Sequence, residues 1–233
     1  MKLPLSAGLL LGVLSPVHPI CAQSADPNLM REAAAVRMGV AQSNAALRQY
    51  TWTEHTEVLV KGDVKSSKDL ICRYNNSGDL TKTPVGQAEE KKDPSGISKR
   101  PAVRKKAGMQ DYIERAVSMI QEYVPPKPEQ LQYLLQNGGA SLGQSGSGKS
   151  EIRFANYFQR GDSIVFTYDP ASKVLLRATI ATTLGSPKDP VTMEAVFETL
   201  PDGVNHLAST TLKATAKKVE VKTQNANYQK AAN

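Results

Sequence analysis

The chain has 233 residues and a mass of 25.2 kDa, with 29 basic and 22 acidic side chains and a formal net charge of +7. A chain of this length buries roughly 70% of the surface of its unfolded state, which is enough for one domain or at most two. Its 40% hydrophobic and 22% charged residues exclude a disordered tail and a polytopic membrane protein.

Residues 1–22 have the layout of a secretory signal peptide. Lys2 gives a positive start, an apolar run from Leu9 to Leu14 follows, and Ala22 offers a small residue at a cleavage point before Gln23. The apolar run is too short to span a bilayer. We therefore expect a periplasmic or secreted protein that is cleaved near Ala22.

Cleavage there changes the composition of the mature chain. It leaves 211 residues, and the loss of Lys2 leaves 28 basic against 22 acidic residues, a net charge of +6. Cys72 remains as the one cysteine, so no internal disulfide is expected. Lipidation of Cys21 is an alternative, although Ile20 stands where a bacterial lipobox has a small residue.

Three stretches have the spacing of helices. Residues 27–49 follow an Asp26-Pro27 start and carry apolar residues at helical intervals. The same spacing returns over 108–123 and again from Pro128 to Leu135, with Pro125-Pro126 between the two. We expect these helices to cover one face of a sheet.

Alternation with a period of two predicts strands on both sides of the helices. It begins at Tyr50, passes a turn at Gly62-Asp63, and reaches a short third strand over 80–85. From Ile152 to Tyr228, turn signals recur about every ten residues between alternating segments. This pattern predicts an antiparallel meander with one buried face.

The mature chain, residues 23–233, is thus expected to be a single α+β domain. The fold is a twisted antiparallel sheet or half-open β-barrel of about eight or more strands, with two to three covering helices. Its composition predicts a flexible charged loop at 86–107 and a Gly/Ser-rich loop at 138–150.

The segment from Gly143 to Ser150 fits the Walker A pattern letter for letter. A phosphate-binding loop needs a buried strand before it and a helix after it. The residues before Gly143 do not read as a central strand, and those after Ser150 read as a strand. We therefore expect a surface loop that binds no nucleotide.

No catalytic or metal-binding grouping can be assembled from the residues. His55 and His206 lie in predicted strands, and with Cys72 they form a zinc site only if all three meet in space. Glu54 and Glu57 fall on opposite faces of one strand, so they cannot act as a carboxylate pair on one substrate. The chain is expected to be a non-enzymatic protein without a metal or cofactor.

The positive charge is concentrated between Lys91 and Lys106. No aromatic residues are interleaved with it, which argues against nucleic-acid binding. Behind a signal peptide, such a segment is a solvated loop or contacts an anionic envelope surface.

Large apolar residues on the predicted strands are core, or line an acyl-chain pocket where the helices do not fill the sheet's concavity. These candidate ligand-binding residues are Trp52, Phe154, Phe158, Phe166, Tyr168, Met193 and Phe197.

The order of signal peptide, N-terminal helix, hairpins around Tyr50-Thr51-Trp52, interposed helices and meander resembles periplasmic lipoprotein carriers of the LolA/LolB type. The resemblance implies an unclosed β-barrel capped by helices, with an apolar cavity for lipid chains. It suggests binding of a lipid, an acyl chain or a lipidated partner. The alternative is a structural or protein-interaction module of the cell envelope without a small-molecule ligand.

Overall fold

The computed structural model describes residues 26–75, 77–86 and 100–230. The predicted signal peptide, Cys21 and the larger part of the predicted charged loop lie outside these residues. The described elements, in chain order, are α1 (Pro27–Leu47), β1 (Tyr50–Val60), β2 (Asp63–Tyr74), β3 (Leu80–Pro84), α2 (Arg100–Gln121), α3 (Pro128–Gln136), β4 (Ala140–Gln144), β5 (Ser150–Ala155), β6 (Ser163–Tyr168), β7 (Leu175–Thr183), β8 (Pro190–Thr199), β9 (Asn205–Ala214), the 3-10 turn η2 (Thr215–Lys217) and β10 (Val219–Lys230).

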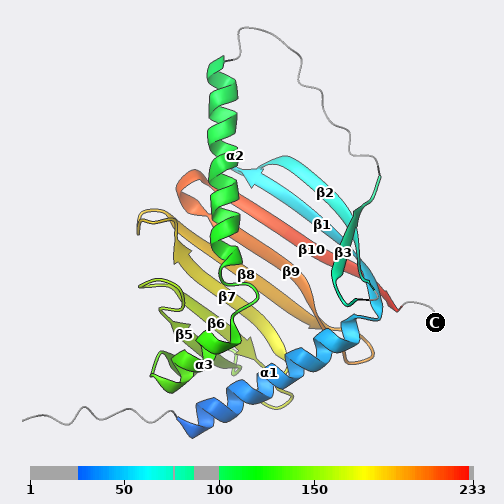
Figure 1. Ribbon diagram of the computed structural model, residues 1–233, viewed down its shortest axis with the longest axis vertical. Helices are drawn as coiled ribbons and strands as arrows, with labels where there is room; N and C mark the ends of the chain where they lie inside the picture. The colour runs from blue at the N-terminus through cyan, green and yellow to red at the C-terminus, as the bar shows by residue number, and fades with distance from the viewer. Residues whose placement is uncertain (1–25, 76, 87–99, 231–233) are drawn as a thin grey trace, which may run out of the picture.

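The strands form one ten-stranded sheet in the order β3-β2-β1-β10-β9-β8-β7-β6-β5-β4 (Figure 1). Every pairing is antiparallel, and every neighbouring pair but β1–β10 is consecutive among the strands. The sheet is curled but open, since β3 and β4 remain as edges. This confirms the predicted α+β class with a half-open antiparallel sheet.

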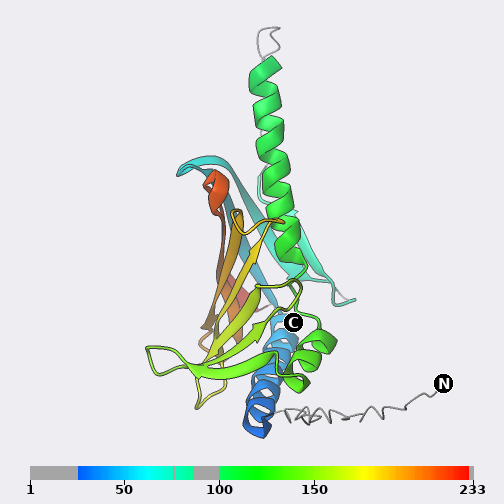
Figure 2. The same cartoon turned by 90° about the vertical axis from the view of Figure 1, so that its left-hand side faces the viewer.

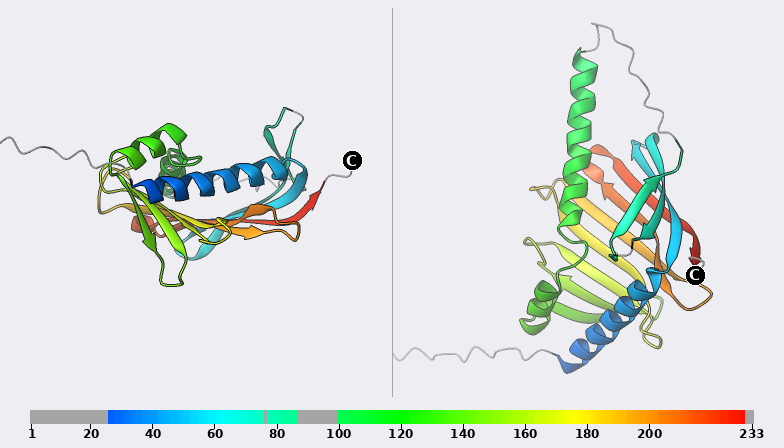
Figure 3. Two further views of the ribbon diagram at one scale, coloured as in Figure 1. Left: turned by 90° about the horizontal axis from the view of Figure 1, so that it is seen from below. Right: turned by 45° about the vertical axis from the view of Figure 1, so that its right-hand side comes forward.

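The three helices lie on one face of the sheet (Figure 3). Helix α1 packs over β7 and β9, α2 over β9, and α3 over β4 and β5. The start of α2 extends beyond the sheet, as Figure 2 shows from the side. The helices therefore cover the apolar concave face mainly toward the β4 edge, and the β3 edge has less cover.

Helix α1 starts where the sequence predicts. The Asp26 side chain accepts a hydrogen bond from the backbone N–H of Asn28 at 2.9 Å, and Pro27 occupies the first turn. The helix ends at Leu47, and the chain enters β1 at Tyr50. This short connection holds the end of α1 beside the start of β1.

The β1–β2 hairpin turns on Lys61 and Gly62. Their φ angles are 58° and 89°, so both residues are left-handed, as in the primed turns that match strand twist. Glycine adopts this conformation without strain, which explains the turn signal in the sequence.

Helix α2 begins at Arg100, inside the segment 86–107 that was expected to be a loop. The prediction took charge as a sign of a loop, but Arg, Lys and Ala are good helix formers. Pro101 is tolerated because it stands in the first turn. Burial of Tyr112, Ala116 and Ile120 on one side then anchors the helix to the sheet.

The expected Gly/Ser loop at 138–150 contains strand β4. Its residues have little strand propensity of their own. They are extended because they pair with β5, with Leu142 opposite Ile152 and Ala140 opposite Phe154. Gly138, Gly139 and the turn from Ser145 to Lys149 remain outside the two strands.

Buried apolar residues form two clusters. The main cluster joins the helices to β5–β10 and centres on side chains such as Tyr112, Ile164 and Val191. The small cluster lies at the other end and consists of Leu47, Tyr50, Trp52, Leu70 and Cys72. The division follows the uneven helix cover, because Leu47 at the end of α1 is the one helix residue buried in the small cluster.

A buried carboxylate fixes the loop after β5. Asp162 is 3% exposed and accepts hydrogen bonds from the backbone N–H groups of Tyr157, Phe158 and Gln159. The Tyr123 hydroxyl donates to the same carboxylate at 2.6 Å, and lies 2.8 Å from the Thr182 hydroxyl. The network ties the α2–α3 connection to the sheet.

Replacing Tyr123 with Phe is expected to lower the free energy of unfolding by about 1–2 kcal/mol, because buried hydrogen-bonding groups lose a partner. Denaturant unfolding measures the change. Tyr133→Phe is the control, since Tyr133 is 59% exposed and should change stability by less than about 0.5 kcal/mol. Equal stability of the two variants would contradict the role of this network.

Candidate functional site

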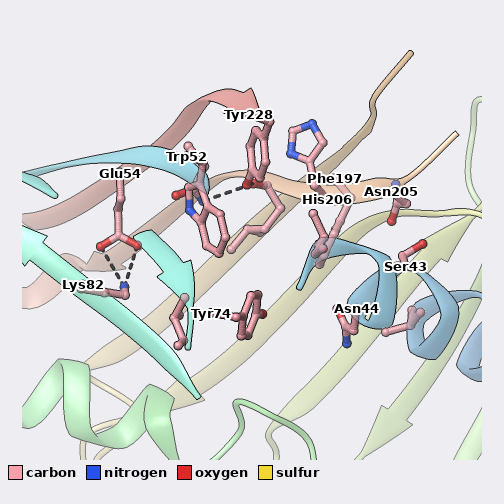
Figure 4. A pocket seen from close by; sticks show the side chains of 15 residues that line it. Ser43, Asn44, Trp52, Glu54, Tyr74, Lys82, Phe197, Asn205, His206 and Tyr228 are labelled. Atoms are coloured by element: carbon pink, nitrogen blue, oxygen red, sulfur yellow. Dashed lines mark hydrogen bonds and ion pairs between the residues drawn. The ribbon is translucent and has the colours of Figure 1, made fainter. Parts of the chain in front are cut away.

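A cavity of about 240 Å³ lies between the C-terminal half of α1 and the concave side of the sheet (Figure 4). Its walls come from α1, from β1–β3 and from β8–β10, so segments from both ends of the chain meet there. The aliphatic and aromatic part of the lining consists of Val40, Leu47, Trp52, Tyr74, Leu80, Phe197, Leu207 and Tyr228. The cavity sits at the seam between the main and the small cluster.

Stacked aromatic rings form one wall of the cavity. Trp52 and Tyr228 are parallel within 13°, with ring centroids 5.4 Å apart, and Tyr74 lies 5.9 Å from Trp52. The Tyr228 hydroxyl donates to the backbone carbonyl of Leu207 at 3.0 Å. Burial raises the pKa of Tyr228, so the ring stays neutral. The wall is thus rigid, uncharged and largely apolar.

Two β-bulges lie beside the cavity. One interrupts the β1–β10 ladder between Thr51 and Thr53, opposite Asn227 with its φ of 57°. The other interrupts the β8–β9 ladder between Val196 and Phe197. A bulge bends its strand and re-aims the side chains that follow. The extra residue lies on β10 in the first bulge and on β9 in the second, so the bulges help to turn Tyr228 and Leu207 toward the cavity.

An ion pair limits the cavity on the β3 side. The Lys82 ammonium lies 2.6 and 2.9 Å from the two oxygens of the Glu54 carboxylate. Glu54 is 14% exposed and Lys82 is 41% exposed, so the carboxylate is the more enclosed partner. The pair spans β2 and ties the short edge strand β3 to β1, which holds Leu80 at the rim of the cavity.

Of the seven predicted ligand-binding residues, the structure brings Trp52 and Phe197 together at this cavity. Both lie on concave strand positions, as the alternation predicts. Ligand binding by them stays a prediction.

The other five predicted residues lie elsewhere. Phe154 and Tyr168 are buried in the main cluster, and Phe166 and Met193 pack against it. Phe158 is 51% exposed, because β5 ends at Ala155 and the chain then turns away. They do not line the cavity under α1, and their role as ligand contacts stays a prediction.

Several cavity residues were missed by the sequence reasoning. Val40, Ser43, Asn44 and Leu47 come from α1, and their position over β8–β10 depends on packing between distant segments. The alternation of β10 does not predict the inward position of Tyr228, because a bulge lies just before it. Its aromatic character near the end of a long strand was the one available signal.

The two histidines have different surroundings. His206 lines the cavity, is 6% exposed and lies against the ring of Tyr228 at a centroid distance of 4.1 Å. His55 is on the opposite, convex face, where its Nδ1 is 2.7 Å from Asp69 and its Nε2 is 3.5 Å from Glu57. The hydrogen bond with Asp69, and then that with Glu57, raises the pKa of His55.

The Walker-like segment forms the hairpin between β4 and β5. A strand follows it, as predicted, and not a helix. The Lys149 ammonium is 2.7 Å from a carboxylate oxygen of Asp169, and this contact is the main cause of the lowered pKa of Asp169. The lysine that binds phosphate in a true P-loop is thus engaged in an ion pair with another turn.

The described residues lack two features, a metal-binding cluster and a membrane-spanning helix. No group of three or more His, Cys, Asp or Glu side chains in them is arranged to hold a metal ion. None of the helices there combines the length and hydropathy needed to cross a membrane.

Comparison with known proteins gives an architectural likeness. No protein-family model and no curated protein matches the sequence. Among solved structures, a DUF1329 family protein from Desulfovibrio piger is 10% identical, with 85% of this chain and 92% of that chain covered and a TM-score of 0.39. A LolA superfamily protein from Nitrosomonas europaea is 5% identical, with 84% and 94% covered and a TM-score of 0.40.

MucB in complex with MucA(peri) is 9% identical, covering 86% of this chain and all of that chain, with a TM-score of 0.22. The weak architectural resemblance to the LolA type, predicted from the order of elements, is therefore also found among solved structures. At these scores we draw no function from it.

Replacing Tyr228 with Ala is expected to shift the fluorescence emission of Trp52, the one tryptophan of the chain, to longer wavelength. Trp52 is 8% exposed and would lose its stacked neighbour to water. The free energy of unfolding should fall by about 2–4 kcal/mol, as for other large-to-Ala changes. Tyr133→Ala, at an exposed position of α3, is the control. An unshifted emission spectrum of Tyr228→Ala would contradict the stacking of Tyr228 on Trp52.

Proposed function

We propose that this protein is a non-enzymatic carrier or receptor of the cell envelope that binds an acyl chain, as part of a lipid or a lipidated partner, in the cavity under α1. The supporting observation is a largely apolar cavity at the end of the concave face that the helices cover least. Ligand pockets are mostly apolar with a few polar groups, which describes this lining.

The volume of the cavity limits the size of the ligand that it can enclose. About 240 Å³ lies below the ~300–1,000 Å³ of typical small-molecule pockets. It therefore accommodates a segment of a single acyl chain, with the rest of the ligand outside. The signal-peptide pattern of residues 1–22 supports an envelope location, in the periplasm or outside the cell.

Trp52 provides a direct test of the acyl-chain function. Bromine atoms quench tryptophan fluorescence at short range, so a brominated fatty acid should quench Trp52 in a saturable manner, while the bromine-free acid should not. Native mass spectrometry of protein purified from its host should detect bound lipid. Absence of both signals would refute the function.

Ser43→Phe is expected to block the cavity, because Ser43 is part of its α1 wall. Quenching by the brominated acid should require at least about tenfold more ligand, or about 1.4 kcal/mol of lost binding free energy. Gln42→Phe is the matched control: it adds the same ring one residue away, at an exposed position of α1. Equal quenching curves for the two variants would contradict binding in this cavity.

A second candidate is a structural or protein-interaction module of the envelope. It is favoured by the projection of α2 beyond the sheet (Figures 1 and 2), since the first turns of this helix carry the basic residues Arg100, Arg104, Lys105 and Lys106 in the sequence.

Deleting residues 88–106 separates the two candidates. The deletion leaves the cavity residues untouched, so acyl binding measured by Trp52 quenching should survive. Binding to anionic lipid vesicles, measured by cosedimentation, should fall if the basic segment is the contact. Loss of acyl binding with a folded protein would contradict the location of the chain under α1.

A further inference from the structure

The cavity under α1 brings aromatic rings and a carboxylate together. Trp52 on β1, Tyr74 on β2 and Phe197 on β8 surround one open space, and Glu54 lies beside it (Figure 4). Glu54 follows Trp52 by two residues on β1, so both side chains are on the concave face. A hydrocarbon chain makes no use of a carboxylate. Aromatic rings together with an acid point instead to a cationic group.

The rings offer the surface that such a group needs. The Trp52 and Tyr74 ring centroids are 5.9 Å apart and the ring planes are inclined by 50°, while the stack on Tyr228 holds the indole in place. Aromatic faces carry negative partial charge, and clusters of such rings bind quaternary ammonium ligands. Because Trp52 and Tyr74 both line the cavity, aromatic surface reaches it from two strands.

Glu54 adds negative potential at the same place. Its side chain is only 14% exposed, so water screens its charge less than that of a surface carboxylate. Cys72, opposite Trp52 in the β1–β2 register, has a raised pKa, because the thiol is buried and because Glu54 is near. Lys82 acts on this pKa in the opposite direction, but more weakly than Glu54. The negative potential therefore extends to the aromatic wall in spite of the ion pair.

Lys82 shows which kind of group this position accepts. Its ammonium lies 2.6 and 2.9 Å from the two Glu54 oxygens, as a cation supplied by the protein itself. The lysine is 41% exposed and stands on the five-residue edge strand β3. Partly exposed ion pairs contribute little to stability, because water competes for both partners. A ligand cation can therefore replace the Lys82 ammonium at Glu54.

The rest of the lining favours a quaternary over a primary ammonium group. A primary ammonium has three N–H donors, each of which needs an acceptor when the group leaves water. A quaternary ammonium has none and presents methyl groups, which suit the aliphatic and aromatic walls formed by residues such as Val40, Leu47 and Phe197.

We infer that the cavity under α1 binds a quaternary ammonium group, which lies against Trp52 and Tyr74 beside the Glu54 carboxylate. The inference goes beyond acyl-chain binding and does not depend on it. The group belongs either to a small solute or to the headgroup of a single-chain lipid.

Choline and 3,3-dimethylbutan-1-ol test the inference, because they share one shape and only choline is charged. Isothermal titration calorimetry should show that choline binds about five- to thirtyfold more tightly, the range expected for cation–π contacts away from water. Choline should also change the emission of Trp52. Dodecylphosphocholine, used as a monomer, separates the two sources: tighter binding than choline indicates a lipid headgroup, and equal or weaker binding a small solute.

Glu54→Gln should weaken choline binding about tenfold and leave binding of the uncharged alcohol unchanged. Glu57→Gln is the matched control, since Glu57 lies on the opposite face of β1, and both affinities should be kept. Lys82→Met is the second variant, which keeps the test valid if Glu54→Gln does not fold. It removes the competing cation, so choline should bind at least about twofold more tightly.

Three results would count against the inference. Equal affinities for choline and the alcohol would overturn the binding of a cation. A preference for choline that neither Glu54→Gln nor Lys82→Met changes would overturn the position beside Glu54. Failure of choline and dodecylphosphocholine to bind, while the brominated fatty acid still quenches Trp52, would overturn the inference and leave the acyl-chain function standing.

Discussion

The structure depends on one constraint: the apolar face of the sheet is wider than the area that the three helices cover. An antiparallel sheet with one apolar face must cover that face, and the helices here reach the strands from β4 to β9. At the β1–β3 end, the cover is reduced to the last turns of α1. Two separate buried clusters result, and the cavity forms at the seam between them.

The curl of the sheet is closely linked to this cavity. The two bulges bend β10 at Asn227 and β9 opposite Phe197, where the walls come together. The bend in β10 allows Tyr228 to stack on Trp52. The Lys82–Glu54 ion pair holds the edge strand β3 at the rim of the cavity. The cavity is therefore built into the strand geometry and does not arise from an accidental packing defect.

The lining combines a rigid aromatic wall with a polar floor. Trp52, Tyr228 and Phe197 offer apolar surface, whereas Asn225, Glu54 and His206 contribute polar groups. Apolar and polar surface thus come from different residues of one cavity.

The sequence by itself determined the secondary structure and the fold class. Apolar periodicity, the Asp26-Pro27 cap and the Gly62 turn depend on residues close in the chain, which is why they could be read correctly. The charge around Arg100 and the glycines around Gly143 predicted loops. The structure has a helix and a strand there, because helix propensity and pairing with β5 outweighed composition. Trp52 and Phe197, which the alternation places on concave strand positions, line the cavity, and ligand binding by them stays a prediction. Only the tertiary structure decided which strand faces the α1 helix covers and that Tyr228 turns inward after a bulge. These features arise from contacts between residues more than a hundred positions apart, and no local pattern in the chain encodes them.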